Sequence, residues 1–196
     1  MSRIVRLAGC IAFGAVLLAG CETTVQKPAY PQISFAHLPK LPVNVARVEV
    51  ENRYASPAAA PNVEHLFPVS PSASALNWGR DRLSPEGAGG VARVVLKRAS
   101  VVEVPLQRTG GIKGAFTTDQ SERYDAVMEM AVQMLDESGN VRATVEAATK
   151  RSRTVPENLS INEREKVWFE MTENLMADLN AALESQIREH MKSWLK

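Results

Sequence analysis

The stretch YDAVMEMAVQMLDESGNVRATVEAAT, residues 124–149, decides the fold. Apolar residues occupy alternate positions on both sides of the polar segment 136–140: Tyr124, Ala126, Met128, Met130, Val132 and Met134, then Val141, Ala143, Val145 and Ala147. Because successive side chains of a strand point to opposite faces, each series predicts a strand with one apolar face. Asp, Ser, Gly and Asn between two such series favour a turn. The stretch therefore predicts a β-hairpin that buries one face.

Downstream of the hairpin, residues 160–195 have the pattern of a long amphipathic helix. Apolar residues recur every three or four positions, and Pro and Gly are absent: Trp168, Met171, Leu175, Leu179, Leu183, Ile187, Met191 and Leu195. Ser160 and Glu163 have the spacing of a capping box, which starts a helix. We expect a helix about 50 Å long, with its apolar stripe packed on the sheet or partly exposed as an interface.

Upstream of the hairpin, the pattern predicts a strand over 43–54 and a loop over 56–61. A short helix follows, capped by Ser72 or Ser74 and ending near Leu83, and then a strand over 91–106 bent near Ala99. The order strand–helix–strand–strand–strand–helix predicts an α+β fold, an antiparallel sheet covered on one face by the short helix and the long C-terminal helix. We expect residues 43–196 to form this single domain.

The N-terminus has the layout of a secretory signal peptide. Arg3 and Arg6 precede an uncharged run of 14 residues, Leu7 to Gly20, which is too short to span a bilayer comfortably. The tetrapeptide Leu18–Ala19–Gly20–Cys21 resembles the bacterial lipobox. That resemblance implies removal of residues 1–20 and attachment of acyl chains such as palmitate to Cys21; a plain signal peptide with a cysteine at the cleavage point is the alternative. Two or three chains would make membrane attachment effectively permanent.

Removal of the signal peptide changes the composition of the chain. The mature protein would have 176 residues with 21 basic and 22 acidic side chains, a balance that offers no electrostatic surface for nucleic acid. Cys10 would leave with the signal peptide and Cys21 would be acylated. No disulfide and no free thiol are therefore expected in the periplasmic domain.

The residues after the cysteine bear on location and reach. The resemblance to lipoproteins implies that an aspartate directly after the cysteine would retain the protein at the inner membrane. This chain has Glu22 at that position, which does not match the signal. We therefore favour the outer membrane over the inner one. Residues 21–42 contain Pro28, Pro31, Pro39 and Pro42 and predict an extended tether rather than packed structure, which could hold the domain up to roughly 65 Å from the headgroups.

Few residues suggest catalysis or metal binding. His37, His65 and His190 are not at ligand spacing, and His190 is expected on the apolar side of the C-terminal helix, at the margin of the core. No serine has a recognisable histidine and acid partner, and no two carboxylates stand out. We expect a protein that is not an enzyme and that uses no cofactor or metal.

Two basic segments are candidate contact surfaces. The glycine-containing loop 108–114 includes Arg108 and Lys113, and Phe116 follows it; the loop lacks a P-loop ending, so we expect a strand connection that could contact a partner. In residues 150–153, alternation places Arg151 and Arg153 on one face and Lys150 and Ser152 on the other. This segment is expected to be a solvated strand end, with contact to anionic lipid as the alternative.

The methionines allow two hypotheses about function. Those of the hairpin and the helix could line an adaptable groove for a lipid or peptide, or they could simply pack helix against sheet: Met128, Met130, Met134, Met171, Met176 and Met191. An open groove would fit a lipid- or glycan-binding carrier with a pocket of several hundred cubic ångströms. Packed methionines would fit an adaptor or assembly factor that binds an envelope protein complex through a sheet edge, a loop or a helix.

The whole pattern resembles small envelope-assembly lipoproteins. The lipobox, the proline-rich tether, the hairpin and the closing helix are similar in order to the lipopolysaccharide-assembly lipoprotein and to auxiliary lipoproteins of lipid-transporting ABC systems. The stretches 152–158 and 162–165 also resemble an uncharacterised proteobacterial lipoprotein family. The resemblance implies a non-catalytic adaptor or assembly factor that faces the periplasm.

Overall fold

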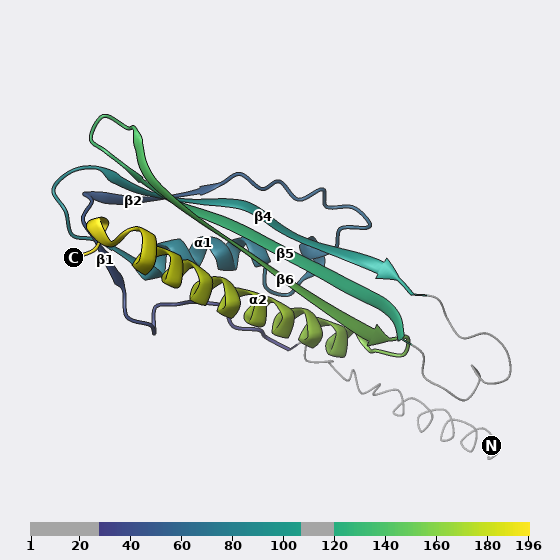
Figure 1. Cartoon of the computed structure of the whole chain (residues 1–196). Coiled ribbons are helices and arrows are strands. Elements are labelled where there is room, and N and C mark those ends of the chain that lie inside the picture. Colours follow the sequence, from purple (N-terminus) through teal and green to yellow (C-terminus); the bar gives the residue numbers. More distant parts are fainter. Residues whose placement is uncertain (1–27, 107–119) are drawn as a thin grey trace, which may run out of the picture.

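The computed structural model describes residues 28–106 and 120–196. They form an elongated α+β fold in which two helices cover one face of a four-stranded sheet (Figure 1). The elements, in chain order, are β1 (Leu41–Val43), β2 (Arg47–Asn52), α1 (Pro71–Arg82), β3 (Leu83–Pro85), β4 (Val91–Pro105), β5 (Gln120–Leu135), β6 (Val141–Pro156) and α2 (Ile161–His190). The predicted fold class is thus confirmed.

The hairpin predicted from residues 124–149 is formed by β5 and β6, which pair in antiparallel register. Every second β5 side chain from Tyr124 to Met134 is buried. In the turn, the side chain of Asp136 accepts a hydrogen bond from the Asn140 amide at 2.9 Å, and Gly139 has a φ of +82°. Glycine adopts this left-handed conformation without the steric cost of a side chain.

The sheet is mixed, with strand order β2-β4-β5-β6. β4 and β5 are antiparallel, as expected, but β2 pairs with β4 in parallel, from Arg47 beside Val91 to Asn52 beside Leu96. The prediction of an entirely antiparallel sheet is therefore wrong at this edge. The connection between β2 and β4 contains α1 and carries the chain back to the end of the sheet where β2 began, so that β4 runs in the same direction.

The expected strand over 43–54 is divided into two. The chain bends at residues 44–46, and β1 pairs in parallel with β3 in a separate two-stranded sheet. Leu195 forms a bridge with Val43 on the other side of β1. The valines that suggested one strand with a slip in its alternation therefore belong to two sheets.

Helix α1 lies close against β2 and β4. Its N-cap is Ser70, whose hydroxyl accepts a hydrogen bond from the Ala73 amide at 3.3 Å, and Pro71 occupies the first helical position. The predicted caps, Ser72 and Ser74, are instead inside the helix. A proline at the first helical position loses no hydrogen bond, which explains the earlier start.

Helix α2 begins as predicted and ends earlier than predicted. The capping box is present, with Ser160 accepting from the Glu163 amide and the Glu163 carboxylate accepting from the Ser160 amide. The apolar stripe from Trp168 to Ile187 is buried on the sheet. The helix ends at His190, and a short 3-10 turn then directs Leu195 to β1. The side chains of the stripe are thus part of the domain's core and do not form an exposed interface.

Residues 28–40, called the strap below, lie beside the two helices. Phe35 of the strap is 6% exposed, and Leu41, the first residue after the strap, is fully buried. The prediction of an unpacked tether up to residue 42 is therefore wrong for its second half. Phe35, Ile33 and Leu38 pack in or against the core, although the proline content of the segment had suggested an unpacked chain.

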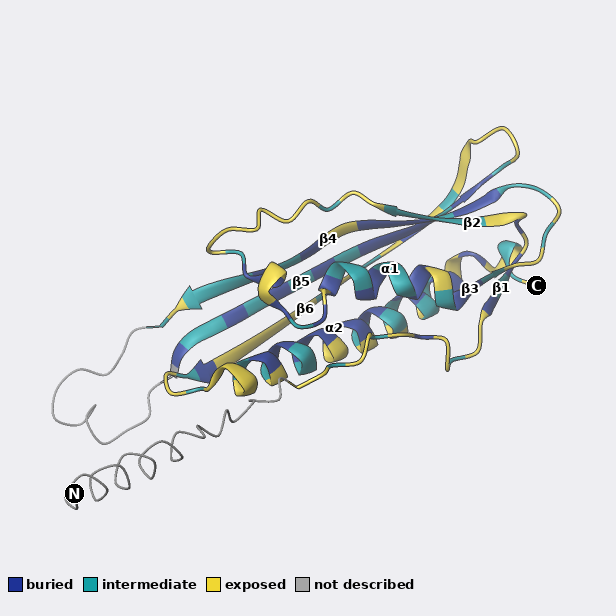
Figure 2. Cartoon of the chain, turned by 180° about the vertical axis from the view of Figure 1, so that it is seen from behind, coloured by how far each residue is buried: buried dark blue, intermediate teal, exposed yellow. Residues whose placement is uncertain are grey.

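The core lies between the sheet and the helices (Figure 2). At one end, the rings of Phe67 and Trp168 are stacked with centroids 5.0 Å apart, and Tyr124 meets Trp168 edge-on at 5.7 Å. The opposite face of the sheet carries cross-strand ion pairs such as Lys97–Glu146 and Arg98–Glu129. This difference between the faces explains why both helices pack on the same side.

Candidate functional site

The strap runs along one flank of α2 and is held by contacts along its length. At its start, the Tyr30 ring lies 5.0 Å from the Phe169 ring, measured between centroids, and the Tyr30 hydroxyl donates to the Asn162 carbonyl at 3.4 Å. Farther along, Asp81 of α1 accepts from the Ser34 hydroxyl and the Phe35 amide, each at 2.8 Å. These contacts hold the strap beside both helices.

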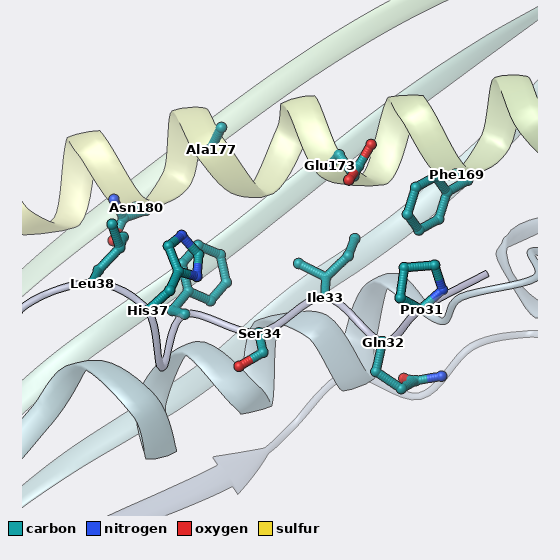
Figure 3. Close-up of a pocket in the computed structure, with 11 residues that line it drawn as sticks. Pro31, Gln32, Ile33, Ser34, His37, Leu38, Phe169, Glu173, Ala177 and Asn180 are labelled. Atoms are coloured by element: carbon teal, nitrogen blue, oxygen red, sulfur yellow. The ribbon is translucent and has the colours of Figure 1, made fainter.

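Two cavities lie between the strap and α2. The first has a volume of about 440 Å³ and has Ile33 and Leu38 of the strap on one side and Phe169 and Ala177 of α2 on the other. Figure 3 shows Phe169 extending from α2 toward Pro31, and Ile33 pointing from the strap toward the helix. The second, about 550 Å³, is bounded by Pro28, Tyr30, Lys166 and Phe169. Both volumes lie in the range of small-ligand sites.

A buried arginine joins the strap to both helices. Arg82, at the end of α1, is 2% exposed. Its Nε donates to Asn180 Oδ1 at 3.0 Å, its Nη2 pairs with the Glu184 carboxylate at 2.5 Å, and its Nη1 donates to the carbonyl of Pro39. Trp78 Nε1 donates to the same Asn180 oxygen at 2.9 Å. Arg82 therefore fixes α1, α2 and the strap in one arrangement.

A buried carboxylate forms a second polar centre, between the loop before α1 and β4. Glu64 is 4% exposed and accepts hydrogen bonds from the Tyr54 hydroxyl (2.6 Å), the Ser56 hydroxyl (2.5 Å) and the Val101 amide (3.0 Å). Burial raises the pKa of the Glu64 carboxyl, but these hydrogen bonds outweigh that effect and hold the pKa below its usual value. An ionised, fully bonded carboxylate fits a structural role better than acid catalysis.

Of the predicted contact residues, only Arg151 and Arg153 belong to the described part of the chain. Both lie on the face of β6 that meets α2: Arg151 pairs with Asp178 at 2.6 Å and Arg153 with Glu170 at 3.7 Å. Ser152 lies on the other face and donates to Asp125. The predicted alternation is thus confirmed, and the strand continues to Pro156. Arg108, Lys113, Phe116 and Cys21 lie outside the described residues.

The three histidines lie in separate places. His37 lines the first cavity, and His65 is exposed in a short 3-10 turn. His190 was expected at the core margin, but its side chain is 53% exposed, whereas Ile187 and Met191 of the stripe are fully buried, so His190 lies off the stripe. Within residues 28–106 and 120–196, no three His, Cys, Asp or Glu side chains are grouped as metal ligands would be.

The six methionines considered as a groove are all at most 4% exposed: Met128, Met130, Met134, Met171, Met176 and Met191. They fill the space between the sheet and α2. Neither cavity described above has a methionine in its wall. The hypothesis of an open methionine-lined groove is therefore wrong, and these side chains serve packing.

The outer edge of β6 is one of the two edges of the four-stranded sheet. β6 is the last strand of the sheet, and no strand described by the structure pairs with its outer edge. Ten of its 16 residues are exposed. A strand edge presents free amides and carbonyls that can pair with another chain. Basic and acidic side chains along β6, such as Arg142, Glu146 and Lys150, would restrict which chain could pair there.

Sequence reasoning missed the Arg82 centre, the Glu64 centre and the strap cavities. An arginine in the last turn of a helix is ordinarily a solvated residue, so no local signal marked Arg82. Glu64 begins a short 3-10 turn in a segment without periodicity. The apolar residues Ile33, Phe35 and Leu38 were the one available signal for a packed strap.

No protein-family model and no curated protein matches the chain. Similar solved structures include a minor lipoprotein from Acinetobacter baumannii, with 13% identity and a TM-score of 0.40 over 74% of this chain and 92% of that chain. Rare lipoprotein B from Shewanella oneidensis has 9% identity and a TM-score of 0.36 over 72% and 94%. A PelC dodecamer from Paraburkholderia phytofirmans has 18% identity and a TM-score of 0.26 over 81% and 92%. All three TM-scores are below 0.5.

Proposed function

We propose that the chain is a membrane-anchored lipoprotein of the cell envelope, acylated at Cys21 and facing the periplasm. The support is the lipobox sequence 18–21 after a basic and apolar leader. No helix in the described residues is long and apolar enough to cross a membrane. Glu22 favours the outer membrane over the inner one.

We propose further that the domain is a non-catalytic adaptor or assembly factor. The observation that carries this role is the exposed outer edge of β6, 16 residues long, which offers backbone groups to a strand of an envelope protein. The methionine face is filled by packing, so a lipid or glycan carrier that uses this face is not supported. Nucleic acid is not expected as a partner, because the mature chain would be close to neutral.

Site-specific photo-crosslinking of the acylated protein in native membranes tests the adaptor role. A photoreactive residue replaces Ala148, which is exposed in the middle of β6, and the matched control replaces Glu189, which is 65% exposed on α2. We expect one envelope protein to crosslink at position 148 and not at 189, and the product to weaken in a Cys21→Ala variant. Equal crosslinking at both positions, or recovery of lipid alone, would contradict an adaptor that binds through β6.

A further inference from the structure

The place where the folded domain begins limits how it can sit on a membrane. Six residues lie between Cys21 and Pro28, the first described residue of the strap, so seven Cα–Cα steps join the two. At about 3.6 Å per residue, the chain between them spans at most about 25 Å. If Cys21 carries the acyl chains, as proposed above, Pro28 must therefore lie within that distance of the headgroups.

The surface beside Pro28 combines two aromatic rings and an exposed apolar residue with lysine and glutamate side chains. Pro28, Tyr30, Lys166 and Phe169 line part of the larger cavity, which is open to solvent. Ile161 begins α2 next to Asn162, which Tyr30 contacts. Ile161 is 77% exposed and the Lys166 side chain 69%. Aromatic rings are enriched at the headgroup level, and lysine is attracted to lipid phosphates. We use the name anchor-end patch for Pro28, Tyr30, Ile161, Lys166 and Phe169.

Three glutamates lie around the anchor-end patch, Glu163, Glu170 and Glu173, and two of them have polar partners. Glu163 is occupied by the capping box, and its carboxylate accepts from both the amide and the hydroxyl of Ser160. Glu170 lies between two cations, with Lys166 Nζ at 3.9 Å and Arg153 Nη2 at 3.7 Å. The charge of Glu170 is thus partly balanced by its neighbours, whereas Glu163 keeps its charge in the cap and Glu173 is exposed to solvent.

We infer that the anchor-end patch lies against the headgroups of the leaflet that holds the acyl chains. This inference rests on the proposed acylation of Cys21. The N-terminal end of α2 is then the membrane-proximal end of the domain. The β5–β6 turn lies at the opposite end (Figure 1), since β6 extends its 16 residues over roughly 50 Å. The β6 edge would then reach away from the membrane toward a partner in the periplasm.

Two exposed apolar residues at opposite ends of the domain provide a matched test. Ile161 begins α2, and Val141, which is 49% exposed, begins β6 beside the turn. Because Cys21 would be acylated and Cys10 removed, Ile161→Cys and Val141→Cys would each give one labelling site. Each acylated variant, labelled with a polarity-sensitive fluorophore, is reconstituted in phosphatidylcholine–phosphatidylglycerol vesicles with or without lipids that carry a nitroxide quencher on the headgroup.

We expect quenching lipids to remove most of the fluorescence from position 161 and to leave position 141 unchanged. Equal quenching at the two positions, or stronger quenching at 141, would overturn the inference. Flotation of the same samples separates the two proposals. Protein that floats with the vesicles but shows no difference contradicts the orientation alone, whereas protein that fails to float contradicts the acyl anchor and the orientation with it.

Discussion

Replacement of Arg82 by alanine should destabilise the domain strongly. The side chain is 2% exposed and bonds Asn180, Glu184 and the carbonyl of Pro39. Removal of one partner of a buried ion pair costs about 3–5 kcal/mol. Glu184 is 29% exposed and keeps its bond to Arg188 Nε at 2.9 Å, which limits the penalty for the charge left behind. We therefore expect the lower end, a loss of about 3 kcal/mol of unfolding free energy.

Thermal and urea denaturation of the detergent-purified protein, followed by circular dichroism, measures this loss. For a chain of this size, about 3 kcal/mol corresponds to a decrease in Tm of roughly 6–12 °C. Arg80→Ala is the matched control, because Arg80 is exposed on the same helix and bonds only Asn77 in α1; it should change stability by less than about 0.5 kcal/mol. Similar small effects for both variants would refute the assignment of Arg82 as the residue that joins strap and helices.

Three further variants test other parts of the structure. Glu64→Gln should lower the free energy of unfolding by about 1–3 kcal/mol at neutral pH, measured by urea denaturation. Because the pKa of Glu64 is lower in the folded protein than its unfolded value of 4.5, the stabilisation is complete above pH 4.5 and disappears as the pH falls through the folded pKa. The difference in stability between the variant and the wild type should therefore become smaller in acid. Gly79→Val should lower the free energy of unfolding by about 1–3 kcal/mol, measured by thermal melts, because a Cβ at position 79 would lie 3.1 Å from side-chain atoms of Val50 and Val94. An unchanged Tm would show that α1 can move away from the sheet. Ser160→Ala should cost about 1 kcal/mol through loss of the α2 cap, and a stability equal to that of the wild type would mean that the capping box contributes nothing.

The parts of the fold that were predictable have strong local periodicity. Residues 124–149 alternate over two strands, and the stripe from Trp168 to Ile187 repeats at helical spacing, so each pattern excludes other structures over many residues. The Ser160–Glu163 pair also fixed the start of α2 from local chemistry alone. These elements supply nearly half of the buried core residues.

The parts that were not predictable depend on contacts between distant residues. The valines around Asn44 suit one strand as well as two, and only the pairing of β1 with β3 and Leu195 decides between them. The parallel direction of β2 follows from the path of the connection through α1, which periodicity does not report.

The polar centres show the same limit. Arg82 is buried because Asn180, Glu184 and Pro39, 43 residues away at the nearest, converge on it. The strap was interpreted from its prolines as a tether, whereas Phe35 secures it between the helices. Buried polar groups are positioned by tertiary structure, so their partners must be known before their role can be assigned.

Intact-mass spectrometry of the protein extracted from membranes tests the central claim most directly. The proposed lipoprotein predicts a chain that begins at Cys21, lacks residues 1–20 and carries the additional mass of acyl chains on that cysteine. A chain that retains residues 1–20, or one that begins elsewhere with no acyl mass, would contradict the anchor and with it the proposed place of the protein in the envelope.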